Sequence, residues 1–221
     1  MKKLLLSLAT LLVASVTLSV AHAQEVKGDG LAGQKKIAMC IGCHGIVGFH
    51  ASFPEVYKVP KISGQSAKYI TSALAAYKRG ERKHPTMRGI TDALTDQDMA
   101  DLAAYFSTNG VNFNQVAPGK APTGSAKAME LVAKGACVSC HGDSFSKPID
   151  PSYPKIAGQY PDYLYAALKA YKTTDKEMIG RGNAIMAGVA KQFSNDELKE
   201  LANYVGSLPG ELKTVPESWI R

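Results

Sequence analysis

The sequence has little of what disulfide-rich, membrane-spanning or nucleic-acid-binding proteins are built from. Its 221 residues include four cysteines, five histidines and one tryptophan. After residue 23, no apolar run approaches the roughly 20 residues that cross a membrane, and no segment alternates apolar and polar side chains as a half-buried strand does. No basic stripe is interleaved with aromatic residues, which argues against nucleic acid as a partner. The chain is therefore expected to fold as an all-α protein.

All four cysteines fall in two copies of one short pattern. Residues 40–44 read CIGCH and residues 137–141 read CVSCH, so each copy is the C-x-x-C-H pattern by which c-type haem is attached. On a helical turn both cysteines and the histidine lie on one face, where two thiols bond one porphyrin and the imidazole reaches its iron. We therefore expect two covalent haems. The residues that hold them are Cys40, Cys43 and His44 in the first copy and Cys137, Cys140 and His141 in the second.

Two other interpretations of the cysteines are open. A zinc site made of two C-x-x-C knuckles has them about 15 to 20 residues apart, whereas 93 residues separate Cys43 from Cys137. A thioredoxin-like redox pair lies beside a βαβ pattern and needs no following histidine. Both interpretations fit the sequence less well than haem attachment does.

The first 23 residues have the pattern of a secretory signal peptide. Lys2 and Lys3 precede an apolar run at residues 4–20, and residues 21–23 (AHA) form a small-residue cleavage site. We therefore expect a mature chain that starts at Gln24 and works in a bacterial periplasm. An uncleaved membrane anchor is the alternative, since the run is just long enough to span.

The sequence repeats itself at an interval of about one small domain. Residues 60–65 (PKISGQ) match residues 154–159 (PKIAGQ), 94 positions later. Further on the offset becomes 99, where residues 87–90 match residues 186–189. The chain is therefore interpreted as a tandem repeat of one haem-binding module.

Helical periodicity divides the chain into two domains and a linker. Apolar residues recur at i, i+4 and i+7 in both halves, as at Ile70, Leu74 and Tyr77. Residues 109–124 are rich in Asn, Pro, Gly and Ala and have no period, which indicates a linker. We expect a first domain at residues 24–108 and a second at residues 125–221.

Met87 and Met186 are the only methionines that align between the two halves. A thioether opposite a histidine raises the reduction potential of a haem and suits electron transfer, so both are candidate axial ligands. Met178 competes with Met186, although at the offset of 94 it falls opposite His84. His84 in turn competes with Met87, whereas the second half has no spare histidine.

The combined pattern resembles the cytochrome c4 family, periplasmic dihaem c-type cytochromes with two class I-like domains. The resemblance rests on C-x-x-C-H, P-K-I-x-G-Q, an A-x-Y-K helix, a methionine before G-[IV] and a last helix ending in A-x-Y. It implies a tandem pair of small helical domains, each wrapped around a covalent haem c. It also implies His44 and Met87 as ligands of one iron, and His141 and Met186 of the other. The carbonyls of Pro60 and Pro154 would accept from the histidines.

The resemblance implies an electron carrier between a respiratory donor, either a quinol-oxidising complex or a dehydrogenase, and a terminal oxidase or reductase. Because both irons are expected to be saturated by protein ligands, neither small-molecule substrate nor catalysis is expected. The alternative is a dihaem redox enzyme, peroxidase-like or thiosulfate- or sulfide-oxidising, or a cytochrome subunit of a periplasmic dehydrogenase. The tail at residues 210–221 departs from the family pattern and is interpreted as a docking segment or a surface-packed end.

The charge of the chain points to the kind of protein partner. The formal net charge of +7 includes Lys2 and Lys3, whose removal leaves +5. A basic rim near an exposed haem edge would attract an acidic docking surface on a redox partner, although a solvated loop is the alternative. The basic cluster around Met87 consists of Lys78, Arg79, Arg82, Lys83 and Arg88.

Overall fold

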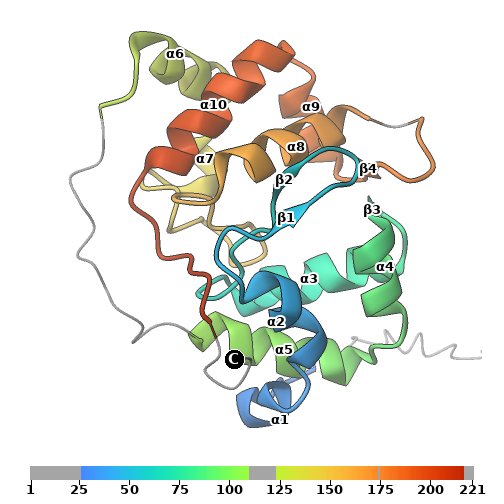
Figure 1. The fold of residues 1–221 in the computed structure, drawn as a ribbon. Coiled ribbons are helices and arrows are strands. Elements are labelled where there is room, and N and C mark those ends of the chain that lie inside the picture. The colour runs from blue at the N-terminus through green and yellow to red at the C-terminus, as the bar shows by residue number, and fades with distance from the viewer. Residues whose placement is uncertain (1–25, 110–122, 174, 217–221) are drawn as a thin grey trace, which may run out of the picture.

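The computed structural model describes residues 26–109, 123–173 and 175–216, so the expected signal peptide and most of the linker lie outside it. The described residues form two helical domains, one above the other in Figure 1. The first contains α1 (Gly30–Gln34), α2 (Ala38–His44), α3 (Ala67–Lys78), α4 (Pro85–Asp92) and α5 (Asp96–Thr108). The second contains α6 (Ala126–Lys134), α7 (Val138–His141), α8 (Pro161–Lys172), α9 (Ala184–Ala190) and α10 (Asn195–Ser207).

The prediction of an all-α fold is confirmed. Strands in the described part of the chain are limited to four of two residues each: β1 (His50–Ala51), β2 (Tyr57–Lys58), β3 (Arg82–Lys83) and β4 (Gly180–Arg181). β1 pairs with β2 inside the first domain, and β3 pairs with β4 across the two domains. Among the described residues, no helix is long and apolar enough to cross a membrane.

Each domain has a small apolar core formed by the stripes of its repeated helices. In the first, Ile41 of α2 packs with Ile70 of α3 and with Leu102 and Phe106 of α5. In the second, the core includes residues of α6, α8 and α10. Both long last helices begin in the same way, because Thr95 and Ser194 each form a capping box. The two repeated halves of the sequence thus form similar helical cores in the two domains.

A buried carboxylate holds α1 against α5. Asp101 is 2% exposed, accepts the backbone N–H of Asp29 at 2.8 Å and pairs with Lys36 Nζ at 2.7 Å. The two helices approach so closely that a Cβ at Gly33 would lie 2.1 Å from the carbonyl oxygen of Asp101. Only glycine fits there.

The two domains dock through the same residues of each copy. The backbone of Lys61 donates to Gln159 Oε1 at 3.0 Å and accepts from its Nε2 at 2.9 Å. The backbone of Lys155 makes the matching pair with Gln65, at 3.0 and 2.9 Å. Both glutamines are 5% exposed. The contact in each direction is therefore a buried pair of hydrogen bonds between backbone and side-chain amide.

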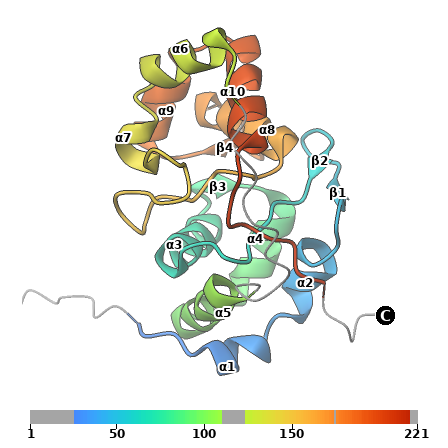
Figure 2. The same ribbon diagram turned by 90° about the vertical axis from the view of Figure 1, so that its left-hand side faces the viewer.

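The C-terminal segment returns from α10 to the first domain, as the red ribbon in Figures 1 and 2 shows. The backbone N–H of Lys213 donates to the carbonyl of Ser63 at 2.9 Å, and Leu212 is 3% exposed. Up to residue 216, the tail is therefore packed across the junction between the domains.

Candidate functional site

Both C-x-x-C-H motifs adopt helical backbone. Cys40, Cys43 and His44 lie in α2. Cys137 immediately precedes α7 with φ −58° and ψ −39°, and its carbonyl accepts the N–H of His141 at 3.0 Å. Positions i, i+3 and i+4 therefore share one face in each domain, as covalent attachment of a porphyrin requires.

The four thiols are free of disulfides. Burial raises the pKa of Cys40 to about 11 and also raises the pKa of Cys137. Zinc binds the thiolate, and in the described ranges no three His, Cys, Asp or Glu side chains gather so as to hold an ion. The zinc interpretation of the cysteines thus finds no site there.

Each motif histidine is fixed by a proline carbonyl. His44 Nδ1 donates to the carbonyl of Pro60 at 2.8 Å, and His141 Nδ1 donates to that of Pro154 at 2.9 Å. Because a carbonyl only accepts, Nδ1 carries the proton and Nε2 presents its lone pair. Burial lowers the pKa of both imidazoles, so they are neutral, the form that binds iron.

The two aligned methionines occupy the same place in their helices. Met87 is the third residue of α4 and donates its N–H to the cap residue His84 at 3.3 Å. Met186 is the third residue of α9 and donates its N–H to the cap residue Asn183 at 2.9 Å. The counterpart of His84 is therefore Asn183, at the offset of 99. The sequence alignment of His84 with Met178 was wrong, because the loop between α8 and β4 is longer than its counterpart.

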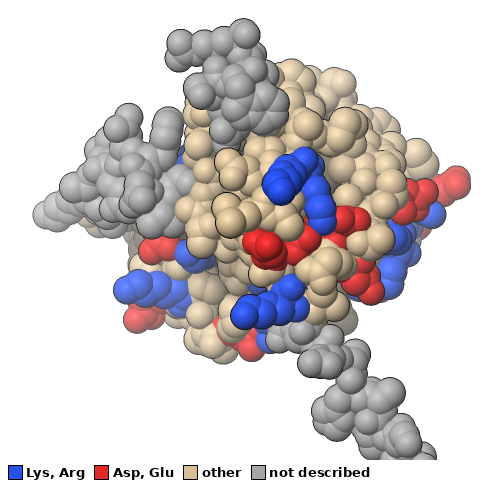
Figure 3. All heavy atoms as spheres, turned by 90° about the horizontal axis from the view of Figure 1, so that it is seen from below, with Lys and Arg blue, Asp and Glu red and all other residues tan. Residues whose placement is uncertain are grey.

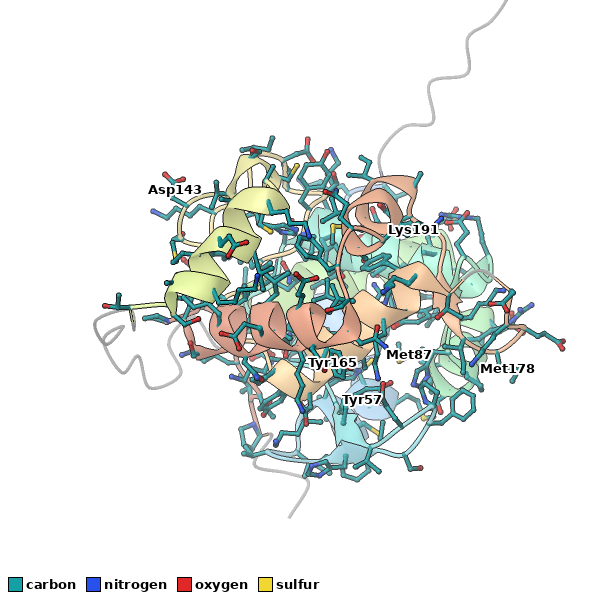
Figure 4. The ribbon with its side chains drawn as sticks, turned by 90° about the horizontal axis from the view of Figure 1, so that it is seen from above. Tyr57, Met87, Asp143, Tyr165, Met178 and Lys191 are labelled. Atoms are coloured by element: carbon teal, nitrogen blue, oxygen red, sulfur yellow. The ribbon has the colours of Figure 1, made fainter. Side chains whose placement is uncertain are left out.

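The two competing ligands are placed differently from the aligned methionines. Met178 is 48% exposed and lies at the edge of the molecule in Figure 4. His84 uses both ring nitrogens: Nδ1 accepts from the Met87 N–H, and Nε2 donates to Tyr57 Oη at 3.0 Å. His84 therefore has no lone pair left for a metal.

The donor set fits haem c. Unpaired thiols and a neutral imidazole with its Nε2 lone pair share one helical face in each domain, which is the set that a covalent haem needs. Both domains thus have the ligands for the group.

The basic cluster near Met87 is smaller than the sequence indicated. Arg79 pairs with Glu81 through two bonds of 2.7 and 2.9 Å, and Lys78 Nζ binds the carbonyl of Leu94. Arg82 lies in the strand that meets the second domain. Lys83 lies in the same strand, and its Nζ donates to the carbonyl of Lys176 in the second domain at 2.7 Å. Arg88 is exposed and has no ion pair among the described residues. On the lower face of the molecule, basic and acidic side chains alternate (Figure 3).

Sequence reasoning missed the residues that join the two sites. Lys61 and Gln65, like Lys155 and Gln159, bind the other domain. Their signal was present, because they lie inside the repeated P-K-I-x-G-Q motif. The repeat by itself indicates a feature of each module, whereas these positions form contacts between modules.

Comparison with known proteins agrees with this geometry. The family profile for Cytochrome c matches residues 30–109 and 125–209. The chain is 32% identical over 211 residues to cytochrome c4 of Pseudomonas aeruginosa, covering 94% of this chain and 100% of that protein. It is 29% identical over 211 residues to a thiosulfate dehydrogenase electron acceptor of Stutzerimonas stutzeri, covering 89% and 91%. The crystal structure of reduced recombinant cytochrome c4 from Pseudomonas stutzeri superposes with a TM-score of 0.56 at 29% identity, covering 82% of this chain and 99% of that one.

Two cytochrome c domains in tandem, each with its own haem-attachment motif, define a dihaem c-type cytochrome that transfers electrons. It carries two covalently bound haems c, one at Cys40 and Cys43 and the other at Cys137 and Cys140. The chain belongs to the cytochrome c4 family.

Proposed function

We propose that this cytochrome carries electrons in the bacterial periplasm from a quinol-oxidising complex or a dehydrogenase to a terminal oxidase or reductase. The observation that carries the proposal is the position of the P-K-I-x-G-Q motif. In the first domain, Pro60 orients His44, and the next residue, Lys61, bonds to the second domain. Pro154 and Lys155 do the same in return. One short segment in each domain thus fixes both the histidine and the neighbouring module, so the two centres are held together for electron transfer.

The proposal includes the axial ligands of each haem. His44 and Met87 would hold the first iron, and His141 and Met186 the second. Support comes from the fixed tautomer of both histidines and from the equivalent helical positions of both methionines. Bound haem supplies the one-electron Fe(III)/Fe(II) couple, and His/Met ligation raises its reduction potential.

Substitution of the methionines tests the ligand set. In the holoprotein, Met186→Leu should abolish the methionine-to-iron charge-transfer band of one haem, lower its potential and let the reduced haem bind carbon monoxide. Met87→Leu should do the same to the other haem. The matched control, Met178→Leu, should leave both haems unchanged. Loss of a band in the control, with both retained in Met186→Leu, would show that the second ligand is misassigned.

A spectroelectrochemical titration of the wild-type holoprotein, with and without carbon monoxide, tests the carrier function itself. Two low-spin haems of high potential that do not bind carbon monoxide are expected, because a saturated iron has no position for a substrate. A haem that binds carbon monoxide readily would contradict the carrier proposal and favour a dihaem redox enzyme.

A second donor is favoured by one comparison. The relative from Stutzerimonas stutzeri is a thiosulfate dehydrogenase electron acceptor, so the donor of this cytochrome would be a thiosulfate-oxidising dehydrogenase. Stopped-flow reduction of the oxidised protein by a purified thiosulfate dehydrogenase with thiosulfate, or by a quinol-oxidising complex with quinol, distinguishes the two donors. The physiological donor should reduce the protein much faster at equal concentration.

We infer that the partner docks with an acidic surface against the first domain near Met87. Arg88 is exposed and has no ion pair in the described part of the chain, whereas the exposed Arg79 is paired with Glu81. The ammonium of Lys83 is bonded to the carbonyl of Lys176, so it adds its charge there without a carboxylate. A positive patch attracts an acidic partner and accelerates encounter, and salt screens this effect.

A further inference from the structure

A phenylalanine in the second domain anchors the segment that holds the motif histidine. The carbonyl of Phe145 accepts the N–H of Ile156 at 2.8 Å and that of Ala157 at 3.1 Å. These two residues closely follow Pro154, whose carbonyl accepts from His141 Nδ1 at 2.9 Å. The position of the proline carbonyl, and with it the bond to the histidine, therefore depends on where the carbonyl of Phe145 lies.

Phe145 has a backbone conformation that its side chain disfavours. Its φ is 56°, and it is one of two non-glycine residues with a positive φ in the described part of the chain. Such a conformation is costly for a residue with a Cβ and persists only where the surrounding contacts enforce it. The side chain of Phe145 is 2% exposed in the core of the second domain, and its N–H donates to the carbonyl of Gly142 at 3.0 Å. Core packing thus holds the left-handed backbone in place.

The loop that contains Phe145 is also joined to the haem-attachment motif. The carbonyl of Cys140 accepts the N–H of Ile149 at 3.1 Å. Gly142, the residue after the motif, has a φ of 73°, and a Cβ there would lie 2.1 Å from the carbonyl oxygen of Lys147. Only glycine fits so close an approach. The motif, the loop and the proline segment are therefore one connected unit.

The first domain holds its proline carbonyl by a different contact. The N–H of Val59, directly before Pro60, donates to the carbonyl of Phe49 at 2.8 Å, next to the β1–β2 pair. Phe49 directly precedes β1 and, unlike Phe145, has no positive φ. The two proline carbonyls thus make the same bond to their histidines, but only the second depends on a left-handed residue.

We propose that Phe145 is a positioning residue for the second haem, an inference that rests on the proposed ligand role of His141. Its left-handed backbone keeps the Pro154 carbonyl within hydrogen-bond distance of His141 Nδ1. A hydrogen bond donated by Nδ1–H raises the basicity of the imidazole. Because a more basic ligand favours Fe(III), this bond lowers the reduction potential of the second haem. Phe145 acts on the iron through Pro154 and His141.

Two isomeric substitutions separate the backbone of Phe145 from its side chain. Phe145→Ile and Phe145→Leu both remove the ring and leave aliphatic side chains of equal size, but only isoleucine is branched at Cβ, which strongly disfavours the left-handed conformation. In the reduced holoprotein, His141 Nδ1–H should exchange about tenfold faster in Phe145→Ile than in Phe145→Leu. The redox equilibrium of the second haem should differ between the two variants by about tenfold toward Fe(II) in Phe145→Ile, or about 59 mV for one electron. The first haem should be the same in both.

The matched control is the same pair of substitutions at Phe49. Because Phe49 has no left-handed backbone to lose, Phe49→Ile and Phe49→Leu should give equal potentials of the first haem and equal exchange of His44 Nδ1–H. Equal potentials and equal exchange in the two Phe145 variants would overturn the proposal. A difference of the same size between the two Phe49 variants would also overturn it, since the effect would then not require a left-handed backbone.

A measurement on the wild-type holoprotein covers the case in which the Phe145 variants do not fold. In hydrogen exchange at increasing, sub-denaturing urea, His141 Nδ1–H and the amide of Ile156 should open with the same free energy and the same urea dependence, because one anchor protects both. Exchange of His141 Nδ1–H through a separate and smaller opening would overturn the proposal.

These results distinguish the failure of this inference from the failure of the proposed function. If His141 is not an iron ligand, the wild-type protein itself should show a second haem that is high-spin or binds carbon monoxide. Two low-spin wild-type haems together with equal Phe145 variants would reject only the positioning role. Faster exchange of His141 Nδ1–H in Phe145→Ile without a shift in potential would overturn the link from the proline carbonyl to the iron.

Discussion

Replacement of Gln159 by leucine should open the junction between the domains without unfolding either one. The change removes both bonds to the Lys61 backbone and leaves a buried N–H and a buried carbonyl without partners. An unsatisfied buried polar group costs about 1–3 kcal/mol. With partial relief by water, a net loss of about 3 kcal/mol in docking free energy is expected, or roughly a 100-fold increase in the open population.

Hydrogen exchange of single amides measures this opening. The amide of Lys61 loses its direct partner in Gln159→Leu. It should therefore exchange faster whether the junction opens as one unit or only locally. The decisive amide is that of Lys155, which bonds to Gln65 in the other half of the junction. If the junction opens as one unit, its protection should also fall by roughly 100-fold.

The control is Gln192→Leu, because Gln192 is exposed and its side chain makes one long intradomain bond of 3.4 Å. It should leave the protection of both amides unchanged. Faster exchange of Lys61 with unchanged protection of Lys155 would refute a cooperative junction. The bonds around Gln159 would then be only local.

Three further results are expected. Asp101→Asn should cost about 1–3 kcal/mol at neutral pH through loss of the Lys36 ion pair, as urea denaturation would measure, whereas exposed Asp92→Asn should cost little. The hydrogen bond from Lys36 lowers the pKa of Asp101, so its stabilisation is present above the usual carboxyl pKa and lost as pH falls; the wild-type and variant acid-denaturation curves should therefore converge. Leu212 is 3% exposed, so Leu212→Ala should destabilise the packed C-terminal tail by about 2–4 kcal/mol and speed hydrogen exchange of the Lys213 amide. Exchange of that amide at the wild-type rate would refute the packing of the tail across the domain junction. Arg88→Glu should slow association with an acidic partner and weaken its dependence on salt, whereas Lys191→Glu in the second domain should change neither.

Much of the site could be predicted, because the residues that attach each haem lie close together in the sequence. The spacing in C-x-x-C-H places two thiols and an imidazole on one helical face wherever the helix lies. Likewise, Met87 and Met186 precede the capping residues Thr95 and Ser194 by the same distance, and they occupy equivalent positions in the two domains. These features need only the backbone of a few consecutive residues, so they could be predicted before any tertiary contact was known.

The comparison of the two halves was less reliable where their lengths differ. Met178 was aligned with His84, yet Asn183 and His84 turned out to be the equivalent helix caps. Capping depends on backbone geometry, so it identifies equivalent positions that a shifting offset conceals. The basic cluster was also overestimated, because a count of charges does not reveal that Arg79 is paired with Glu81.

Periodicity and short spacings in the sequence are enough to predict two helical haem modules in tandem, with their attachment residues and candidate ligands. How the modules meet depends on contacts between distant residues, which become visible in the folded chain. Gln65 bonds Lys155 across 90 positions, and Arg82 meets Arg181 across 99. The repeat contains these residues but does not show whether they bond within their own domain or to the other domain. The answer depends on which buried amides and charges each folded domain leaves without a partner.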